Sequence, residues 1–209
     1  MRIDIWSDVI CPWCYLGSRR LRSALTHFEG TEVDVRWHAF ELDPNAPAEV
    51  QELRPALERK YGPGSFDAMT GRLTALGPAD GIDYRFDLAK RVNTFDAHRL
   101  IEWAAGQPDG QDAVVDRLFL AYFTEGADLS DHPTLVRLAV EAGADRDAAT
   151  EVVASDAFAT EVRGDEQRAR DLDITGVPAF VVDERMMIPG AQEVDTIVRI
   201  LQRAVANAG

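Results

Sequence analysis

The sequence is short of positive charge, and this limits its partners. It has 22 Lys and Arg residues against 36 Asp and Glu residues, which gives a formal net charge of −14 over 209 residues. Nucleic-acid binding needs clustered Lys and Arg to neutralise phosphates, and anionic membranes attract basic segments in the same way. We therefore expect neither nucleic acid nor a membrane among the partners.

Long apolar runs are also missing. No segment approaches the roughly 20 consecutive apolar residues of a membrane-spanning helix. The chain opens with Met-Arg-Ile-Asp-Ile-Trp, which alternates as a strand does and lacks the basic, apolar and small-residue regions of a secretory signal. If the chain starts at this methionine in the cell, we expect a cytoplasmic protein.

Cysteine is scarce, since only Cys11 and Cys14 occur. A disulfide scaffold needs more cysteines spread along the chain, and a bridge between these two would restrict the unfolded chain very little. A zinc site needs four ligands, whereas the histidines are scattered singly, at His27, His38, His98 and His132. We expect no metal site, and redox chemistry explains the pair better than stability does.

The apolar pattern predicts a strand, a helix and a second strand at the start of the chain. Residues 2–6 and 31–37 alternate as strands, and a helix between them begins near Cys11 and ends at Gly30. Pro12 suits the first turn of this helix. We expect three arginines on its exposed side, Arg19, Arg20 and Arg22.

The middle of the chain reads as helices, with no convincing strand between residues 49 and 172. The predicted helices are 50–61, 65–76, 86–91, 95–105, 111–124, 133–142, 146–153 and 157–172. Two short strands, 179–182 and 186–188, and an amphipathic helix, 193–206, follow. The order is therefore βαβ, a helical block, then ββα, which predicts an α/β domain made of 1–44 and 173–209 and interrupted by an all-helical domain, 45–172.

A Cys-x-x-Cys motif at a helix start is well placed for thiol chemistry. The unpaired N–H groups and the helix dipole favour an anion there, so Cys11, at the exposed end, is the expected nucleophile. Cys14, one turn further on, would resolve the mixed disulfide. Pro12 supplies no N–H, and Trp13 offers an apolar wall. The carboxylate of Asp8 would repel a thiolate and so raise the pKa of Cys11. The sequence leaves open whether this effect or that of the helix N-terminus is larger.

Four motifs in order carry a family resemblance. They are Ser-Asp-Val-Ile-Cys-Pro-Trp-Cys-Tyr-Leu-Gly (7–17), Trp-His-Ala-Phe-Glu-Leu (37–42), Asn-Thr-Phe-Asp-Ala-His-Arg-Leu (93–100) and Thr-Gly-Val-Pro-Ala-Phe (175–180). Together they resemble the FrnE-like subfamily of DsbA-type oxidoreductases, in the thioredoxin superfamily. The resemblance spans nearly the whole chain and implies a thioredoxin fold with an inserted helical domain, and thiol–disulfide oxidoreductase or isomerase activity.

The resemblance also implies roles for residues outside the cysteine motif. Pro178 would be a cis proline that lies against the two cysteines, and the backbone of Val177 would bind a substrate strand. Asp4 is the candidate for a buried acid that aids proton transfer at Cys14.

Three residues of the motifs are candidates for substrate binding, namely Phe40, Asn93 and His98. Asn93 is equally well suited to cap a helix, and a histidine inside a helix more often packs than binds a ligand.

The same branch includes glutathione-dependent relatives, the kappa-class glutathione transferases and the 2-hydroxychromene-2-carboxylate isomerases, which have Ser where this chain has Cys11. A glutathione-dependent isomerase or transferase acting on small aromatic or polyketide-like molecules is therefore a second hypothesis. A third is a binding protein that keeps the fold without the chemistry. We expect no cofactor beyond the cysteine pair, with glutathione as an optional co-substrate. The substrate is a protein or small molecule with a thiol or disulfide, and a homodimer is compatible with the surfaces of the final helix and the insertion.

Overall fold

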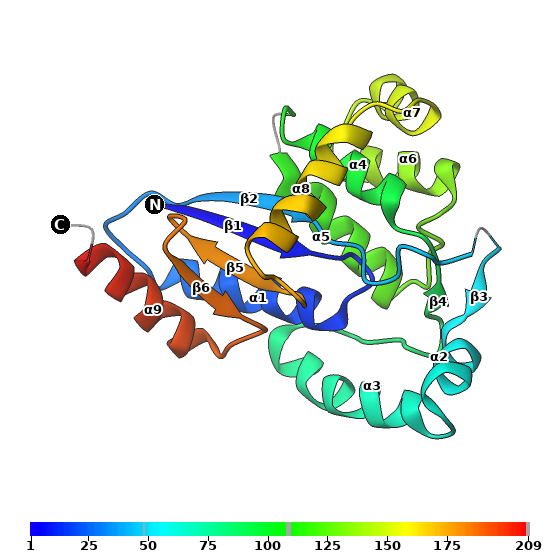
Figure 1. Ribbon diagram of the computed structural model, residues 1–209, viewed down its shortest axis with the longest axis horizontal. Helices are drawn as coiled ribbons and strands as arrows, with labels where there is room; N and C mark the ends of the chain where they lie inside the picture. Colours follow the sequence, from blue (N-terminus) through cyan, green and yellow to red (C-terminus); the bar gives the residue numbers. More distant parts are fainter. Residues whose placement is uncertain (48, 108–109, 208–209) are drawn as a thin grey trace.

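The computed structural model describes residues 1–47, 49–107 and 110–207, and a four-stranded mixed sheet lies at its centre (Figure 1). The strands are β1 (Arg2–Ser7), β2 (Asp34–Ala39), β5 (Ala179–Val182) and β6 (Met186–Pro189). Their spatial order is β2-β1-β5-β6, with β1 parallel to β2 and antiparallel to β5, and β5 antiparallel to β6. The first and last thirds of the chain therefore meet in one sheet, as predicted.

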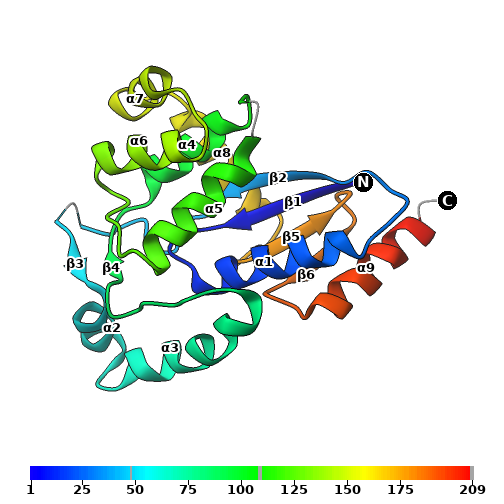
Figure 2. The ribbon, with the colours of Figure 1, turned by 180° about the vertical axis from the view of Figure 1, so that it is seen from behind.

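Helices cover both faces of this sheet. One hydrophobic cluster joins Ile5 of β1 to Leu16 of α1 (Pro12–Thr26) and Ile197 of α9 (Val194–Ala206), which lie side by side in both views (Figures 1 and 2). A second cluster places Trp6 of β1 against Ala169 of α8 (Ala159–Asp171). Neighbouring residues of a strand point to opposite faces, so α8 covers the face that α1 and α9 leave open.

The remaining helices belong to the segment between β2 and β5. They are α2 (Leu53–Tyr61), α3 (Ser65–Leu76), α4 (Phe95–Ala104), α5 (Gly110–Phe123), α6 (His132–Glu141) and α7 (Arg146–Ala154), with a 3-10 turn at Gly77–Asp80. α2 and α3 lie apart from α4, α6 and α7 in both views (Figures 1 and 2). Among the described helices, none combines the length and the apolar composition that crossing a membrane requires.

Seven of the eight helices predicted for the middle of the chain are present, but the one at 86–91 is wrong. Residues there form a turn, in which Leu88 N donates to Arg85 O, and then the strand β4 (Lys90–Arg91). β4 pairs antiparallel with β3 (Gln51–Glu52), so the expectation of no strand in this block is also wrong. Strands of two residues are too short to show the alternation by which a strand is recognised in sequence.

Three further differences concern α1 and the segment that follows it. The helix ends at Thr26 rather than at Gly30, and β2 begins at Asp34 rather than at 31. Arg20 is buried, not exposed, because its guanidinium pairs with Asp80, with Nε and Oδ2 3.2 Å apart, and with Glu193 at 2.8 Å. A paired and hydrogen-bonded guanidinium can be buried where a free one cannot. Arg20 therefore ties α1 to the 3-10 turn and to the start of α9.

Candidate active site

The backbone around Cys11 places its side chain at the N-terminus of α1. β1 ends at Ser7, and Cys11 N donates to Asp8 O at 3.0 Å across the following turn. Cys11 itself is extended, at φ −87° and ψ 111°, and its carbonyl accepts from Cys14 N and Tyr15 N at 3.0 and 3.2 Å. Cys11 is thus the N-cap residue, and Pro12 occupies the first helical position, where no N–H is needed.

The two thiols are close together and unbridged. Cys11 and Cys14 lie 3.2 Å apart, and both are free. Burial raises the pKa of the Cys14 thiol well above its usual value, and the neighbouring Cys11 raises it further. Cys14 therefore stays protonated at neutral pH, as a resolving thiol should until a mixed disulfide forms.

Cys11 is less exposed than the sequence indicated. Its exposed fraction is 3%, because the loop before β5 covers it and Val177 O accepts a hydrogen bond from its Sγ at 3.5 Å. The position of Cys11 at the helix start made an exposed thiol the natural expectation. The structure instead places the thiol at the wall of a cavity.

The peptide bond between Val177 and Pro178 is cis, as the family resemblance implied. Pro178 packs against α1 at Gly17, where a β-carbon would lie 3.1 Å from Pro178 Cγ and 3.1 Å from Phe180 Cζ. Such contacts are tighter than side chains normally make, so glycine at this position lets α1 approach the proline loop closely. The loop therefore contacts Cys11 through Val177 and the next turn of α1 through Pro178.

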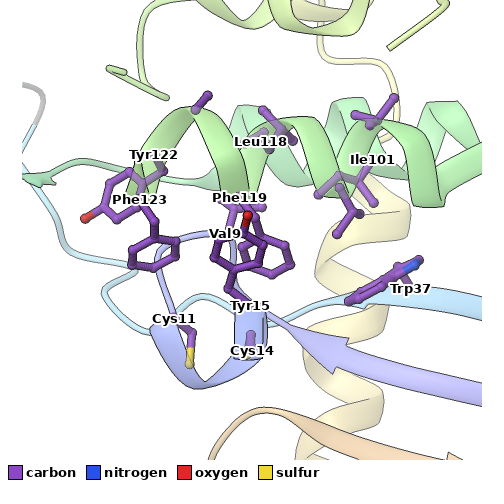
Figure 3. Close-up of a cluster of buried hydrophobic side chains, with 14 of the residues drawn as sticks. Val9, Cys11, Cys14, Tyr15, Trp37, Ile101, Leu118, Phe119, Tyr122 and Phe123 are labelled. Atoms are coloured by element: carbon purple, nitrogen blue, oxygen red, sulfur yellow. The ribbon is translucent and has the colours of Figure 1, made fainter. Parts of the chain in front are cut away.

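A cavity of about 730 Å³ opens beside Cys11. Most of its walls are apolar, from α2, α3, α5 and the 176–177 loop, and include Leu53, Leu57, Leu73, Phe86, Phe123 and Val177. Tyr122 and Phe123 of α5 lie above Cys11 (Figure 3). Trp13 also lines the cavity and is half-buried, with the Arg72 guanidinium 5.5 Å from its ring centre, so it forms part of the wall as predicted.

Four cationic residues also line this cavity, namely Arg59, Lys60, Lys90 and Arg91. Arg91 pairs with Asp43 at 2.7 Å, and Arg59 donates to Gln51 Oε1 at 3.2 Å. No pattern in the sequence predicts this group, because a full helix and a turn lie between Lys60 and Lys90. The β3–β4 pairing and the bond from Leu53 N to Ala89 O, 3.1 Å long, bring their segments together.

Asp8 and His98 form a buried pair behind the cysteine loop. Asp8 is fully buried, and its carboxylate accepts from Leu42 N at 2.7 Å. His98 Nε2 lies 3.4 Å from Asp8 Oδ1 and has no hydrogen-bond partner within the described residues. His98, predicted as a substrate-binding candidate, therefore points to Asp8 and is not among the described residues that line the cavity.

The other two substrate-binding candidates also lie outside the cavity lining of the described chain. Phe40 packs on the cluster around Trp6, on the α8 face of the sheet. Asn93 Oδ1 accepts from Phe95 N at 2.9 Å at the start of α4, and its amide lies 3.4 Å from Glu41 Oε1. Asn93 is therefore not the N-cap, which is Thr94, but its side chain makes a local turn directly before α4.

Asp4 is buried, but the structure does not bring it to Cys14. Its Oδ1 lies 2.7 Å from Arg2 Nη2 and 2.7 Å from His38 Nε2, and His38 Nδ1 lies 2.6 Å from Asp165. Burial opposes ionisation of Asp4, but the hydrogen bonds from His38 and Arg2 outweigh it and lower the pKa. Asp4 is therefore an ionised member of a network that joins β1, β2 and α8.

A family model for the DSBA-like thioredoxin domain matches residues 2–202. The chain belongs to the DSBA-like thioredoxin family. The DSBA-like chain is 37% identical to a probable DsbA oxidoreductase from Streptomyces coelicolor, with a TM-score of 0.92 over 99% of this chain and 90% of that one. The predicted fold class, an α/β thioredoxin fold with many added helices, is confirmed.

Two more distant structures share the fold of this DSBA-like protein. The cytosolic disulfide reductase DsbM from Pseudomonas aeruginosa, solved with GSH, is 19% identical over 99% of this chain and 100% of that one, with a TM-score of 0.72. A 2-hydroxychromene-2-carboxylate isomerase is 17% identical over 100% and 98%, also with a TM-score of 0.72. At these identities the likeness is one of fold.

Sequence reasoning missed the immediate surroundings of Cys14 in this DSBA-like protein. The side chain of Ser7 and the backbone N–H of Asp8 are the groups that favour its thiolate, against the larger effects of burial and of Cys11. Ser7 and Asp8 were visible in the first motif, just before the cysteines. Only the tight turn after β1 shows that these residues, rather than Asp4, approach Cys14.

Proposed function

We propose that this protein is a thiol–disulfide oxidoreductase or isomerase of the FrnE-like type, with Cys11 as the nucleophile and Cys14 as the resolving thiol. The observation that carries the proposal is a free Cys-x-x-Cys pair, 3.2 Å apart, at the N-terminus of a helix and against a cis-proline loop. Cys11 is the N-cap residue of α1 and lines the cavity, while burial raises the pKa of the Cys14 thiol and holds its proton.

The reaction is a two-electron exchange. The Cys11 thiolate attacks one sulfur of the substrate disulfide, the S–S bond breaks, and the other sulfur leaves as a thiolate. Cys14 then loses its proton and attacks Cys11 Sγ, which releases the second substrate sulfur and forms the Cys11–Cys14 disulfide. The reverse sequence oxidises a substrate dithiol, so the direction depends on the relative potentials of the two pairs.

The neighbouring residues support this chemistry. Pro12 O accepts a hydrogen bond from Tyr84 Oη at 2.6 Å, which fixes the turn between the cysteines. Trp13 forms part of the cavity wall beside Cys11. In our proposal the backbone of Val177, beside cis Pro178, binds the substrate during attack. Its carbonyl already lies 3.5 Å from Cys11 Sγ.

Glutathione is the co-substrate that we propose. No cofactor other than the cysteine pair enters the mechanism. The relative DsbM, a cytosolic disulfide reductase, was solved with GSH, which makes glutathione a reasonable reductant to test. A cytoplasmic location would keep the pair reduced and favour reduction of substrates.

A glutathione redox titration tests the proposal, with alkylation and intact-mass readout of the two cysteines. We expect a reversible transition to an internal disulfide that is absent in Cys11→Ser. Cys14→Ser should accumulate mixed disulfides with substrate thiols. A protein that never forms the internal disulfide, at any ratio of reduced to oxidised glutathione, would contradict the assignment.

A second candidate is a glutathione-dependent isomerase acting on a small aromatic molecule. The cavity of about 730 Å³ beside Cys11 favours it, since this volume suits a small ligand. In that case the titration should stop at a glutathione adduct on Cys11.

A further inference from the structure

The cavity beside Cys11 combines an apolar interior with cationic residues, in a chain that is acidic overall. Lys60 and Lys90 are the two lysines of the sequence, and both line this cavity. Three large apolar side chains of its lining are exposed, namely Leu42, Tyr61 and Met69. The cavity thus offers both an apolar surface and positive charge to a ligand.

Neither lysine has a carboxylate partner among the described residues. Most arginines of the chain pair with an acid, as Arg91 does with Asp43 at 2.7 Å. No such pair within 4.0 Å includes Lys60 or Lys90 in the described ranges, and Lys60 Nζ instead lies 5.1 Å from the Tyr61 ring centre. Both ammonium groups are therefore available to an anion that enters the cavity.

We propose that the substrate of Cys11 is a small disulfide with an apolar or aromatic body and a carboxylate. The inference rests on the proposed thiol–disulfide exchange and names its substrate class. The body would fill the space between α2, α3 and Phe123, and the carboxylate would bind Lys60 and Lys90. The net charge of −14 repels anions at long range, so a preference for an anion must come from these local charges.

The size and shape of the site favour a small molecule over a protein strand. The volume of about 730 Å³ lies within the roughly 300–1,000 Å³ of small-molecule sites. Cys11 is 3% exposed, so the scissile disulfide must come to it inside the cavity. Cys11 then attacks one sulfur, the second sulfur leaves as a thiolate, and Cys14 closes the internal disulfide as the first product thiol departs.

Two aromatic disulfides distinguish the effect of charge on the substrate from the general reactivity of the Cys11 thiol. Dithiobis(nitrobenzoate) carries a carboxylate on each ring, whereas dithiodipyridine carries none at pH 8. Stopped-flow measurements give the rate of the reduced protein with the anionic probe divided by its rate with the neutral probe. This ratio is then divided by the same ratio for a free thiol such as reduced glutathione. We expect this normalised ratio to exceed one, and to fall towards one in high salt.

Lys60→Gln and Lys90→Gln should each lower the rate with the anionic probe about 2- to 5-fold, and lower the rate with the neutral probe less. Arg199→Gln removes the same charge from the exposed side of α9 and is the matched control, expected to leave the ratio unchanged. Equal effects of the lysine variants on both probes, or a normalised ratio of one or below, would overturn the proposal.

The test also separates the two levels of inference. If neither probe forms a mixed disulfide with Cys11, the proposed exchange reaction fails, and this inference fails with it. If both probes react but a disulfide-linked peptide reacts faster than either, the exchange reaction stands and the small anionic substrate is wrong.

Discussion

The side chain of Cys14 is among the most enclosed in the protein, with an exposed fraction of 1%. Burial and the adjacent Cys11 both raise the pKa of its thiol. We expect iodoacetamide at pH 7 to modify Cys11 in the reduced native protein and to leave Cys14 unmodified, whereas both react in denaturant. Peptide mass mapping measures this directly. Equal labelling of the two cysteines in the native state would contradict the assigned roles.

Glu41 is a second residue whose charge the fold disfavours. Burial and the neighbouring Glu166 raise its pKa to about 7, against opposing bonds from Arg163 at 2.7 Å. A carboxyl with a raised folded-state pKa binds its proton more tightly when folded, so its contribution to stability is present at low pH and is lost as the pH rises through about 7.

We therefore expect Glu41→Gln to raise the melting temperature at pH 8.5 and to raise it less at pH 5.5, since the loss develops between the usual pKa of 4.5 and about 7. Glu29→Gln, at an exposed position before Gly30, is the matched control and should shift neither value. Thermal melts at the two pH values measure the effect. A Glu41→Gln variant that is less stable at pH 8.5 would show that its ion pair with Arg163 outweighs burial.

The sequence could identify the residues whose roles depend on near neighbours in the chain. Cys11, Cys14 and Pro12 are three positions of one helical turn, and a motif suffices to find them. The roles of Asp8, His98 and the two lysines depend on contacts across 30 or more residues, for which no periodic pattern exists. Asp4 shows the same limit, since its burial was predicted correctly while its partner His38, 34 residues away, was not foreseen.

At the scale of elements, the contact between α1 and the cis-proline loop decides how the cysteines meet their substrate. A β-carbon at Gly17 would lie 3.1 Å from both Pro178 and Phe180. Gly17→Ala should therefore force α1 and the loop apart and lower the stability, by on the order of 1–3 kcal/mol. The rate of Cys11 with a disulfide should change as well, because Val177 moves relative to its thiol.

Gly164→Ala in α8 is the control for this variant, since a β-carbon there meets nothing within 4 Å. In a helix interior this change should stabilise the protein slightly, by about 0.5–1 kcal/mol. Denaturant unfolding measures both variants. A Gly17→Ala variant as stable as the control would show that the cis-proline loop can shift without lowering the free energy of unfolding.

The elements themselves were largely predictable, because helices of 9 to 15 residues span several turns, over which apolar residues can recur at helical spacing, as they do in α1. The β3–β4 ribbon was not, although it and the bond from Leu53 N at the start of α2 to Ala89 O determine where the cationic residues lie. Its two-residue strands depend on a partner 38 or more residues away rather than on their own sequence.

At the scale of the whole molecule, the sheet and the helical insertion share one core. A single hydrophobic cluster contains Ile5 of β1, Tyr15 of α1, Phe119 of α5 and Leu138 of α6. Tyr15 stacks on Phe119, with ring centres 5.1 Å apart (Figure 3). The predicted division at residues 44 and 172 thus separates parts of the chain that pack together.

We expect the sheet and the insertion to unfold in one transition, because a shared core makes their stabilities interdependent. In a Trp103→Phe variant, which removes the tryptophan of α4, fluorescence reports on the sheet and α1 through Trp6, Trp37 and Trp13, and far-UV circular dichroism reports largely on the helices. The two denaturation curves should coincide. Separate midpoints would show that the insertion is an independent folding unit.

The recess of Cys11 has a consequence for the cell. If the substrate is the small disulfide proposed above, a nucleophile at the wall of a cavity meets a disulfide that enters the cavity more readily than one that lies flat on a folded surface. Under that proposal, proteins with surface disulfides would react more slowly with Cys11 than small disulfides of the same reactivity.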